Sequence, residues 1–184
     1  MITDDKTIKI NDDDIKLIKP VSIGNTGLMY LVVDKNEKEF FFKPAQNKNG
    51  EKREYRAYIQ EAAAKLQSII SPETSVQCNI ATINGMFGAI QEKIDIKSNS
   101  INMEELYSDQ NLKNIIGEYV VDYCLCNYDS HERNFIIDKD NRIKGIDKEQ
   151  AFRYIDEENS DILTMNNNYN EQYRRKSSNL CTNF

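Results

Sequence analysis

The spacing of apolar residues changes near Glu51 from a strand-like to a helical period, and this change limits the possible folds most. Before it, residues 28–33 and 39–43 are rich in β-branched and aromatic side chains, as strands are. After it, apolar residues recur at steps of three and four, as on one side of a helix: Tyr55, Ile59, Ala62, Leu66 and Ile69. Pro72 ends the pattern. Strands and helices in separate blocks predict an α+β fold.

The remaining elements are located by turn signals and by a second helical pattern. Asn84-Gly85 is a strong hairpin turn. The chain begins with a strand-like stretch within 8–34, interrupted at 24–27, and strands 28–33 and 39–43 are joined by the polar residues 34–38. A helix over about 51–70 and strands 75–83 and 86–92 follow. After a polar connector at 95–111 come a helix at 111–126 and short strands at 135–138 and 143–147. The second helix has these residues on one side: Ile115, Ile116, Tyr119, Val120, Tyr123 and Cys124.

This order predicts two lobes. A small sheet lobe with one helix covers 1–93, and a short, mainly helical lobe covers 94–184. A ligand is expected in the cleft between two such lobes. The polar, asparagine-rich stretch 166–179 predicts a tail that is marginally folded or depends on a partner.

Composition restricts the class of protein and its partners. The chain has 184 residues, 39% of them hydrophobic and 29% charged, which suits one soluble globular core. Its net charge of −6 argues against a nucleic-acid partner. It has neither a long apolar run, a basic amphipathic helix nor a signal sequence, so we expect a cytoplasmic protein that does not act on membranes. Its four cysteines form no C-x-x-C pair and are expected to be reduced thiols: Cys78, Cys124, Cys126 and Cys181.

The chain's only histidine lies in a loop crowded with polar residues, NYDSHERNFIID at 127–138. Asp129 and Asn134 are five positions apart in this loop, and Asp147 follows 13 positions later, at the end of the short hairpin. Phosphoryl transfer from a nucleotide needs such a set. One carboxylate takes the proton of the acceptor hydroxyl, while an amide oxygen and a second carboxylate hold magnesium against the phosphates. Because magnesium keeps several waters, one carboxylate and one amide suffice.

The alternative interpretation of the loop is structural. Asparagine and aspartate side chains readily close turns, so Asn127, Asp129, Asn134 and Asp147 also suit a polar turn between two strands. For the loop by itself, this structural interpretation is the favoured one. The added spacing to Asp147, with strand residues on both sides of the turn, favours a functional site.

The segments CNYDSHERNFIID and IKGIDKEQAF resemble the catalytic and metal-binding segments of the atypical protein-kinase-like superfamily. That grouping includes phosphatidylinositol 3- and 4-kinases, actin-fragmin kinase, the secretory-pathway kinases and HipA-type bacterial toxin kinases. The resemblance implies a minimal two-lobed kinase-like fold with ATP and magnesium as cofactors. It implies Asp129 as the catalytic aspartate, and Asn134 and Asp147 as metal ligands.

The resemblance extends to the strand-rich half. Lys43, at the end of FFFK, resembles the lysine that contacts the α- and β-phosphates; Glu54 resembles its acidic partner, with Glu61 as second choice. Gly24-Asn25-Thr26-Gly27 falls where kinase folds cover the phosphates, and Gln91-Glu92-Lys93 where backbone groups meet the adenine. Ordinary alternatives remain, namely a solvated lysine, a glutamate stabilised at a helix start and a plain hairpin turn.

The function implied by the resemblance is ATP- and magnesium-dependent phosphoryl transfer to a protein hydroxyl, with a bacterial or phage serine/threonine kinase as the leading hypothesis. Three alternatives stay open: a pseudokinase-type interaction module that binds nucleotide, a lipid kinase, and an enzyme that transfers AMP. Only 153–184 follows Phe152, where kinases usually place several more helices. Three interpretations stay open: a minimal kinase, a piece of a longer chain, and a fragment whose short lobe a partner completes. His131 is expected to support the loop, and Arg133 to contact a phosphate or face water.

Overall fold

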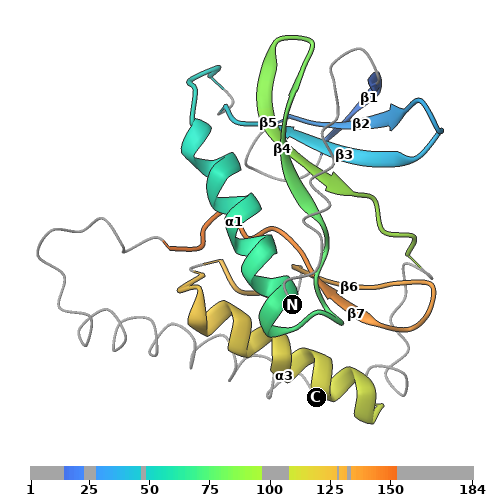
Figure 1. Ribbon diagram of the computed structural model, residues 1–184, viewed down its shortest axis with the longest axis vertical. Coiled ribbons are helices and arrows are strands. Elements are labelled where there is room, and N and C mark those ends of the chain that lie inside the picture. The colour runs from blue at the N-terminus through green and yellow to red at the C-terminus, as the bar shows by residue number, and fades with distance from the viewer. Residues whose placement is uncertain are drawn as a thin grey trace, which may run out of the picture. The chain divides into compact units, whose positions relative to one another are not determined.

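The computed structural model of the chain describes residues 15–22, 28–46, 49–96, 108–127, 129–131 and 134–152. The described residues form two helices and two antiparallel sheets, which confirms the α+β class (Figure 1). The chain divides into two compact units, and each is described by itself. The first is Met1–Ala62 with Gln77–Ile94, and the second is Ala63–Val76 with Asp95–Phe184. The predicted lobes differ from these units in assigning 63–76 to the first lobe and Ile94 to the second.

The first unit contains a five-stranded antiparallel sheet. Its strands are β1 (Ile15–Ser22), β2 (Leu28–Asp34), β3 (Glu39–Pro44), β4 (Cys78–Ile83) and β5 (Met86–Glu92). They are ordered β1-β2-β3-β5-β4 across the sheet. The predicted β4–β5 turn is confirmed, since Asn84 and Gly85 have φ of +50° and +74°, as a tight two-residue hairpin needs. The Asp34 carboxylate closes the β2–β3 turn by accepting the N–H groups of Asn36 and Lys38, both at 2.8 Å.

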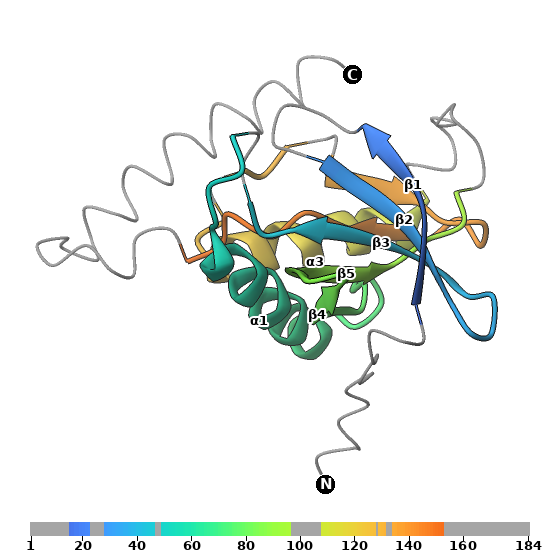
Figure 2. The ribbon, with the colours of Figure 1, turned by 90° about the horizontal axis from the view of Figure 1, so that it is seen from above.

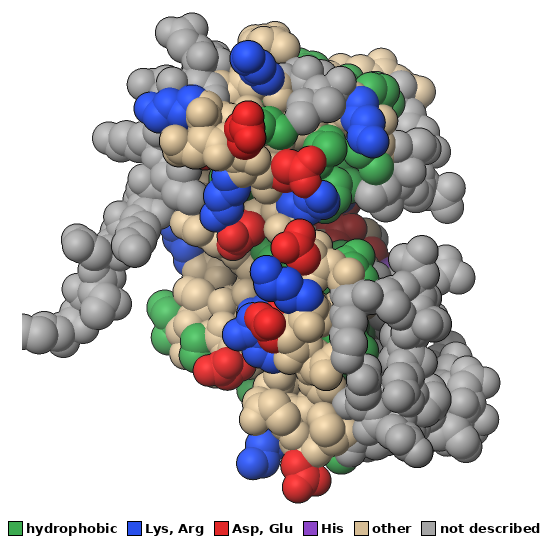
Figure 3. Space-filling model, turned by 90° about the vertical axis from the view of Figure 1, so that its right-hand side faces the viewer, with side chains coloured by type: hydrophobic (Ala, Val, Ile, Leu, Met, Phe, Trp, Pro, Cys, Tyr) green, Lys and Arg blue, Asp and Glu red, His purple; other side chains and the backbone are tan. Residues whose placement is uncertain are grey.

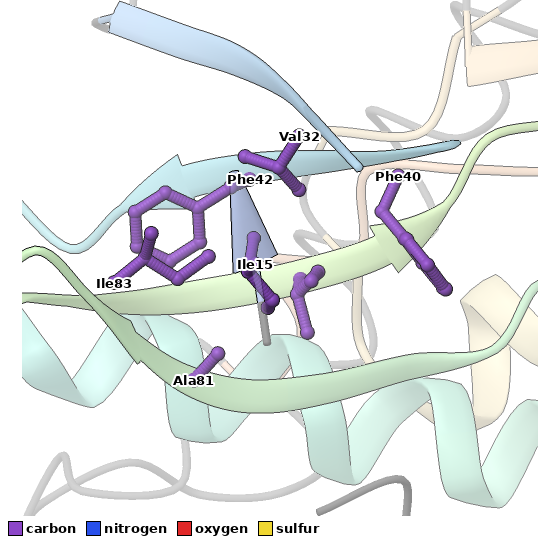
Figure 4. Packing of buried hydrophobic residues seen from close by; sticks show 7 residues of the cluster. Ile15, Val32, Phe40, Phe42, Ala81 and Ile83 are labelled. Atoms are coloured by element: carbon purple, nitrogen blue, oxygen red, sulfur yellow. The ribbon is translucent and has the colours of Figure 1, made fainter. Parts of the chain in front are cut away.

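Side chains alternate across this sheet, so its two faces differ. One face carries the apolar core (Figure 4): Ile15, Val32, Phe40, Phe42, Ala81, Ile83 and Ile90. Lys43 points to the opposite face, because strand neighbours alternate and Phe42 belongs to the core. Lys43 pairs with Ala89, which in turn pairs with Ile80, so these three residues share that face.

Helix α1 (Glu54–Ile70) begins in the first unit, where its first turns lie beside β4 and β5 (Figure 2). It packs on the sheet face that carries Lys43, since it contacts Phe87 and Gln91, which share that face with Ala89. The ring centroids of Tyr58 and Phe87 are 5.4 Å apart. Gln60 Nε2 donates to Gln91 Oε1 at 3.4 Å. These contacts hold the first turns of α1 beside β4 and β5.

The second unit contains the end of α1, helix α3 (Asp109–Cys124) and a two-stranded sheet of β6 (Phe135–Ile137) and β7 (Ile143–Gly145). Ser108 caps α3 by accepting the N–H of Asn111 at 3.3 Å. The predicted short hairpin is confirmed, and Asp138 closes its turn by accepting the N–H groups of Asp140 and Arg142, both at 2.9 Å. Within the described part of the chain, neither helix has the length and apolar character that crossing a membrane requires.

Both predicted helices exist, but many of the apolar residues from which they were predicted are exposed to solvent. Leu66 and Ile69 of α1 are 40% and 75% exposed, and Ile116 and Val120 of α3 are 62% and 47% exposed. The buried residues of α3 are instead Asn111, Asn114, Glu118, Val121 and Asp122. An amphipathic helix ordinarily turns its apolar side inward. Here the inward side of α3 is polar because its carboxylates have buried partners, described below.

The charges on the described surface are mixed in sign. On the face shown in Figure 3, Lys and Arg side chains alternate with Asp and Glu side chains, and neither sign forms a continuous patch. A polyanion would meet no extended basic surface on this face.

Candidate active site

The polar loop after α3 is closed by its own asparagine side chains. Asn127 Oδ1 accepts the N–H of Asp129 at 3.4 Å, and Asn134 Nδ2 donates to the carbonyl of Asp129 at 2.7 Å. His131 Nε2 lies 3.6 Å from Asp129 Oδ1. The Asn127 contact is the local turn that the structural alternative predicts. The Asn134 contact fixes the amide plane, so Oδ1 of Asn134 is turned away from the Asp129 carbonyl.

The hairpin backbone brings Asp147 next to Asn134. The N–H of Ile146 donates to the carbonyl of Asn134 at 2.9 Å, so Asp147 is one residue from a direct backbone contact. Asp147 has a φ of +57°, in the left-handed region that few non-glycine residues occupy. The three acidic and amide residues predicted for this site therefore lie on two segments that are hydrogen-bonded to each other.

The side chains of Asn134 and Asp147 supply the kind of donor that magnesium takes. Among the described residues, no group of three or more His, Cys, Asp or Glu side chains is arranged to hold a metal ion. The predicted ligand pair is smaller, with one amide oxygen and one carboxylate. Magnesium bound together with a nucleotide takes its other ligands from phosphates and water. Hard oxygen donors on adjacent segments fit that requirement.

A buried ionic network that the sequence analysis missed lies beside this loop. Lys148 Nζ donates to Glu118 Oε2 at 2.8 Å and to Asp122 Oδ1 at 2.6 Å. Glu118, Asp122 and Lys148 are 0%, 1% and 3% exposed. Burial acts to lower the pKa of Lys148, but the carboxylates of Asp122 and Glu118 outweigh it and raise the pKa above its ordinary value. The buried lysine therefore stays charged.

The two carboxylates of the network have different further partners. Asp122 accepts hydrogen bonds from Asn127 Nδ2 at 2.9 Å and from Ser130 Oγ at 2.7 Å, so it contacts the polar loop. Glu118 accepts from Gln67 Nε2 at 2.7 Å and from the Thr74 hydroxyl. Glu118 thus binds the end of α1 and the turn after it, and among the described residues of the loop it has no hydrogen-bond partner.

The same network explains why a glycine stands at the end of β7. A Cβ atom added to Gly145 would lie 1.7 Å from Glu118 Oε2, which is an impossible contact. The sequence signal for the network was the four-residue spacing of Glu118 and Asp122 on the side of α3 away from its apolar stripe. Each of these two carboxylates by itself resembles an ordinary surface charge, so neither was predicted to be buried.

In the first unit, the surroundings of Lys43 include Glu61. Burial and Glu61 raise the pKa of the Cys78 thiol to about 12, and Lys43 acts against them. Glu61 also accepts the N–H of Ile80 at 3.3 Å, on the sheet face that carries Lys43. Glu54 is exposed at the first turn of α1. The structure therefore brings the second-choice glutamate, Glu61, into the neighbourhood of Lys43.

The raised pKa of Cys78 predicts a loss of stability in alkali. The unfolded thiol loses its proton near pH 9 and the folded thiol near pH 12, so between these values the folded state holds one more proton. The free energy of unfolding should therefore fall by about 1.4 kcal/mol per pH unit from this residue. Urea unfolding at pH 8 to 10.5 should show a steeper decline for the wild type than for Cys78→Ala. Cys124→Ala, at an exposed position, should show the same decline of unfolding free energy with pH as the wild type. If Cys78→Ala showed that decline as well, the prediction would be contradicted.

The remaining predicted nucleotide contacts are only partly described. Gly24, Asn25, Thr26 and Gly27, like Arg133, lie outside the described residues. At the end of β5, the N–H of Glu92 donates to the Gln77 carbonyl at 3.1 Å and that of Lys93 to the Glu39 carbonyl at 3.4 Å. Because these N–H groups are engaged within the unit, an adenine contact by Gln91-Glu92-Lys93 would use carbonyl groups or displace those bonds. That contact stays a prediction.

The chain matches no model of a known protein family and no curated protein sequence. The resemblance to atypical kinases therefore rests on the motif residues themselves.

Proposed function

We propose that this chain transfers the γ-phosphoryl group of ATP to a hydroxyl group of a protein, in a magnesium-dependent reaction. The observation that carries the proposal is the linkage of three residues within one unit. The Asn134 amide donates to the carbonyl of Asp129, and the Asn134 carbonyl accepts the N–H of the residue before Asp147. A proton acceptor and two metal-type oxygen donors on joined segments are what phosphoryl transfer needs.

In the proposed reaction Asp129 is the general base. Its carboxylate takes the proton of the acceptor hydroxyl while that oxygen forms a bond to the γ-phosphorus. The bond between the γ-phosphorus and the β–γ bridging oxygen breaks, and ADP leaves with the electron pair. Asn134 Oδ1 and the Asp147 carboxylate hold magnesium, which supplies positive charge for the phosphate oxygens. His131, 3.6 Å from Asp129, supports the loop.

Lys43 is proposed to bind the α- and β-phosphates, as the resemblance implies. We propose Glu61 in preference to Glu54 as the acidic group that orients Lys43. The charges of Lys43 and Glu61 both affect the pKa of the Cys78 thiol, so both side chains lie near that thiol. Gly24-Asn25-Thr26-Gly27 and Gln91-Glu92-Lys93 keep the nucleotide-binding roles that the resemblance implies.

Labelled ATP tests the proposal. The purified full chain is incubated with magnesium and either γ- or α-labelled ATP, with dephosphorylated casein as acceptor and, separately, with phosphatidylinositol vesicles. Label on protein from γ-labelled ATP alone supports the proposal, and Asp129→Asn should remove it. Protein label from α-labelled ATP would indicate AMP transfer, and label in lipid alone would indicate a lipid kinase. Either result, or no transfer at all, overturns the proposed protein kinase.

A further inference from the structure

Asp122 is the point at which α3, the polar loop and the segment after β7 meet. Its carboxylate accepts hydrogen bonds from three side chains, namely Asn127, Ser130 and Lys148, at 2.6 to 2.9 Å. Asn127 and Ser130 stand on either side of Asp129, and Lys148 directly follows Asp147. One buried side chain thus contacts the neighbours of both proposed catalytic and metal-binding aspartates.

We infer that Asp122 is a positioning residue, which sets the placement of Asp129 relative to Asp147 by binding Asn127 and Ser130 on one segment and Lys148 on the other. This inference rests on the proposed function, because the two aspartates matter together only if they serve one reaction. Asp122 itself is not proposed to touch substrate. A side chain that holds two reacting groups in register acts through their geometry.

The network also offers a matched comparison for Asp122. Glu118 lies one turn earlier on α3, is equally buried and binds the same Lys148 ammonium, but its other partners are Gln67 and Thr74. Asp122→Asn and Glu118→Gln each leave one buried carboxylate paired with Lys148. Each also replaces two accepting oxygens by one, since an amide accepts only through its oxygen. The two variants therefore differ mainly in whether the loop loses its anchor.

The test compares these variants in the full chain by two readouts. Amide hydrogen exchange at Asp129 should be at least about tenfold faster in Asp122→Asn than in Glu118→Gln, since only Asp122 binds the loop side chains of Asn127 and Ser130. Steady-state kinetics with ATP and casein should show kcat at least about tenfold lower in Asp122→Asn and lowered by less than about threefold in Glu118→Gln. Urea unfolding of each variant separates these effects from global stability.

The outcomes distinguish this inference from the proposed function. Equal exchange and equal kcat in the two variants overturn the positioning role while phosphoryl transfer by the wild type stands. Faster exchange in Asp122→Asn with unchanged kcat also overturns it. A wild type that transfers no phosphate overturns the proposed function, and with it the catalytic purpose of the placement; the exchange comparison then still decides whether Asp122 anchors the loop. If Asp122→Asn does not fold, Ser130→Ala removes one loop contact without changing charge, and it should speed exchange at Asp129 in the same way.

Discussion

Replacing Lys148 by methionine should lower the free energy of unfolding by about 3–5 kcal/mol, the usual effect of removing one partner from a buried ion pair. The reason is that Glu118 and Asp122 would remain fully buried without their cation. Their other hydrogen bonds, from neutral groups, do not offset the repulsion between two carboxylates in a medium of low polarity. Urea denaturation followed by far-ultraviolet circular dichroism measures the change.

Lys144, in strand β7 just before Lys148, provides the control. Its Nζ donates to the backbone carbonyl of Glu73 at 2.7 Å and to that of Ser75 at 3.4 Å, and it pairs with no carboxylate in the described residues. Lys144→Met should therefore lower the free energy of unfolding by only about 1 kcal/mol. Equal losses in Lys144→Met and Lys148→Met would show that the buried carboxylates do not depend on Lys148.

The order of the elements could be predicted because it depends on local signals. The Asn84-Gly85 turn and the β-branched runs beside it specify a hairpin without reference to the rest of the chain. The helices over Glu54–Ile70 and Asp109–Cys124 were located by apolar spacing in the same way. Their ends shifted by a few residues because caps such as Ser108 decide them.

The buried sides of the helices could not be predicted from the same spacing. The rule that apolar residues face inward assumes that charged side chains find no partners inside. Glu118 and Asp122 break that assumption together. Two partners of Asp122, Asn127 and Ser130, lie only 5 and 8 positions away, in the loop that follows α3. The other partners of the two carboxylates come from distant positions: Gln67, Thr74 and Lys148. No local pattern connects positions so far apart in the sequence. For the same reason the sequence ranked Glu54 above Glu61, because only the packing of α1 on the sheet brings Glu61 near Cys78 and Lys43.

The residues of the candidate site were predictable as a set because their chemistry is concentrated in two short motifs. The motifs alone do not show which contacts hold the two segments side by side. The loop residues alone would form a polar turn, and the alternative interpretation of the sequence rested on this. The structure adds the Asn134–Ile146 backbone bond and the Asp122 contacts, which tie that turn to the segment that carries Asp147.

Asp147→Asn and Asp129→Asn should separate nucleotide binding from turnover. Asparagine tolerates the left-handed backbone at position 147, where φ is +57°, so Asp147→Asn removes a charge without adding strain. Since the carboxylate is proposed to hold magnesium, calorimetric titration with ATP should show the gain in affinity from magnesium reduced at least about tenfold.

Asp129→Asn should keep that gain within about twofold and lower kcat by about 100- to 10,000-fold, because a general base acts on the acceptor proton and not on the bound nucleotide. Asp140→Asn, an exposed aspartate in the turn of the same hairpin, serves as the control and should leave both quantities near the wild-type values. Full magnesium-dependent affinity in Asp147→Asn would remove that residue from the metal site, and wild-type turnover in Asp129→Asn would remove the proposed base. A loss of affinity in both variants to the same degree would mean that the loop binds nucleotide as one structural unit, without the division of roles proposed for its two aspartates.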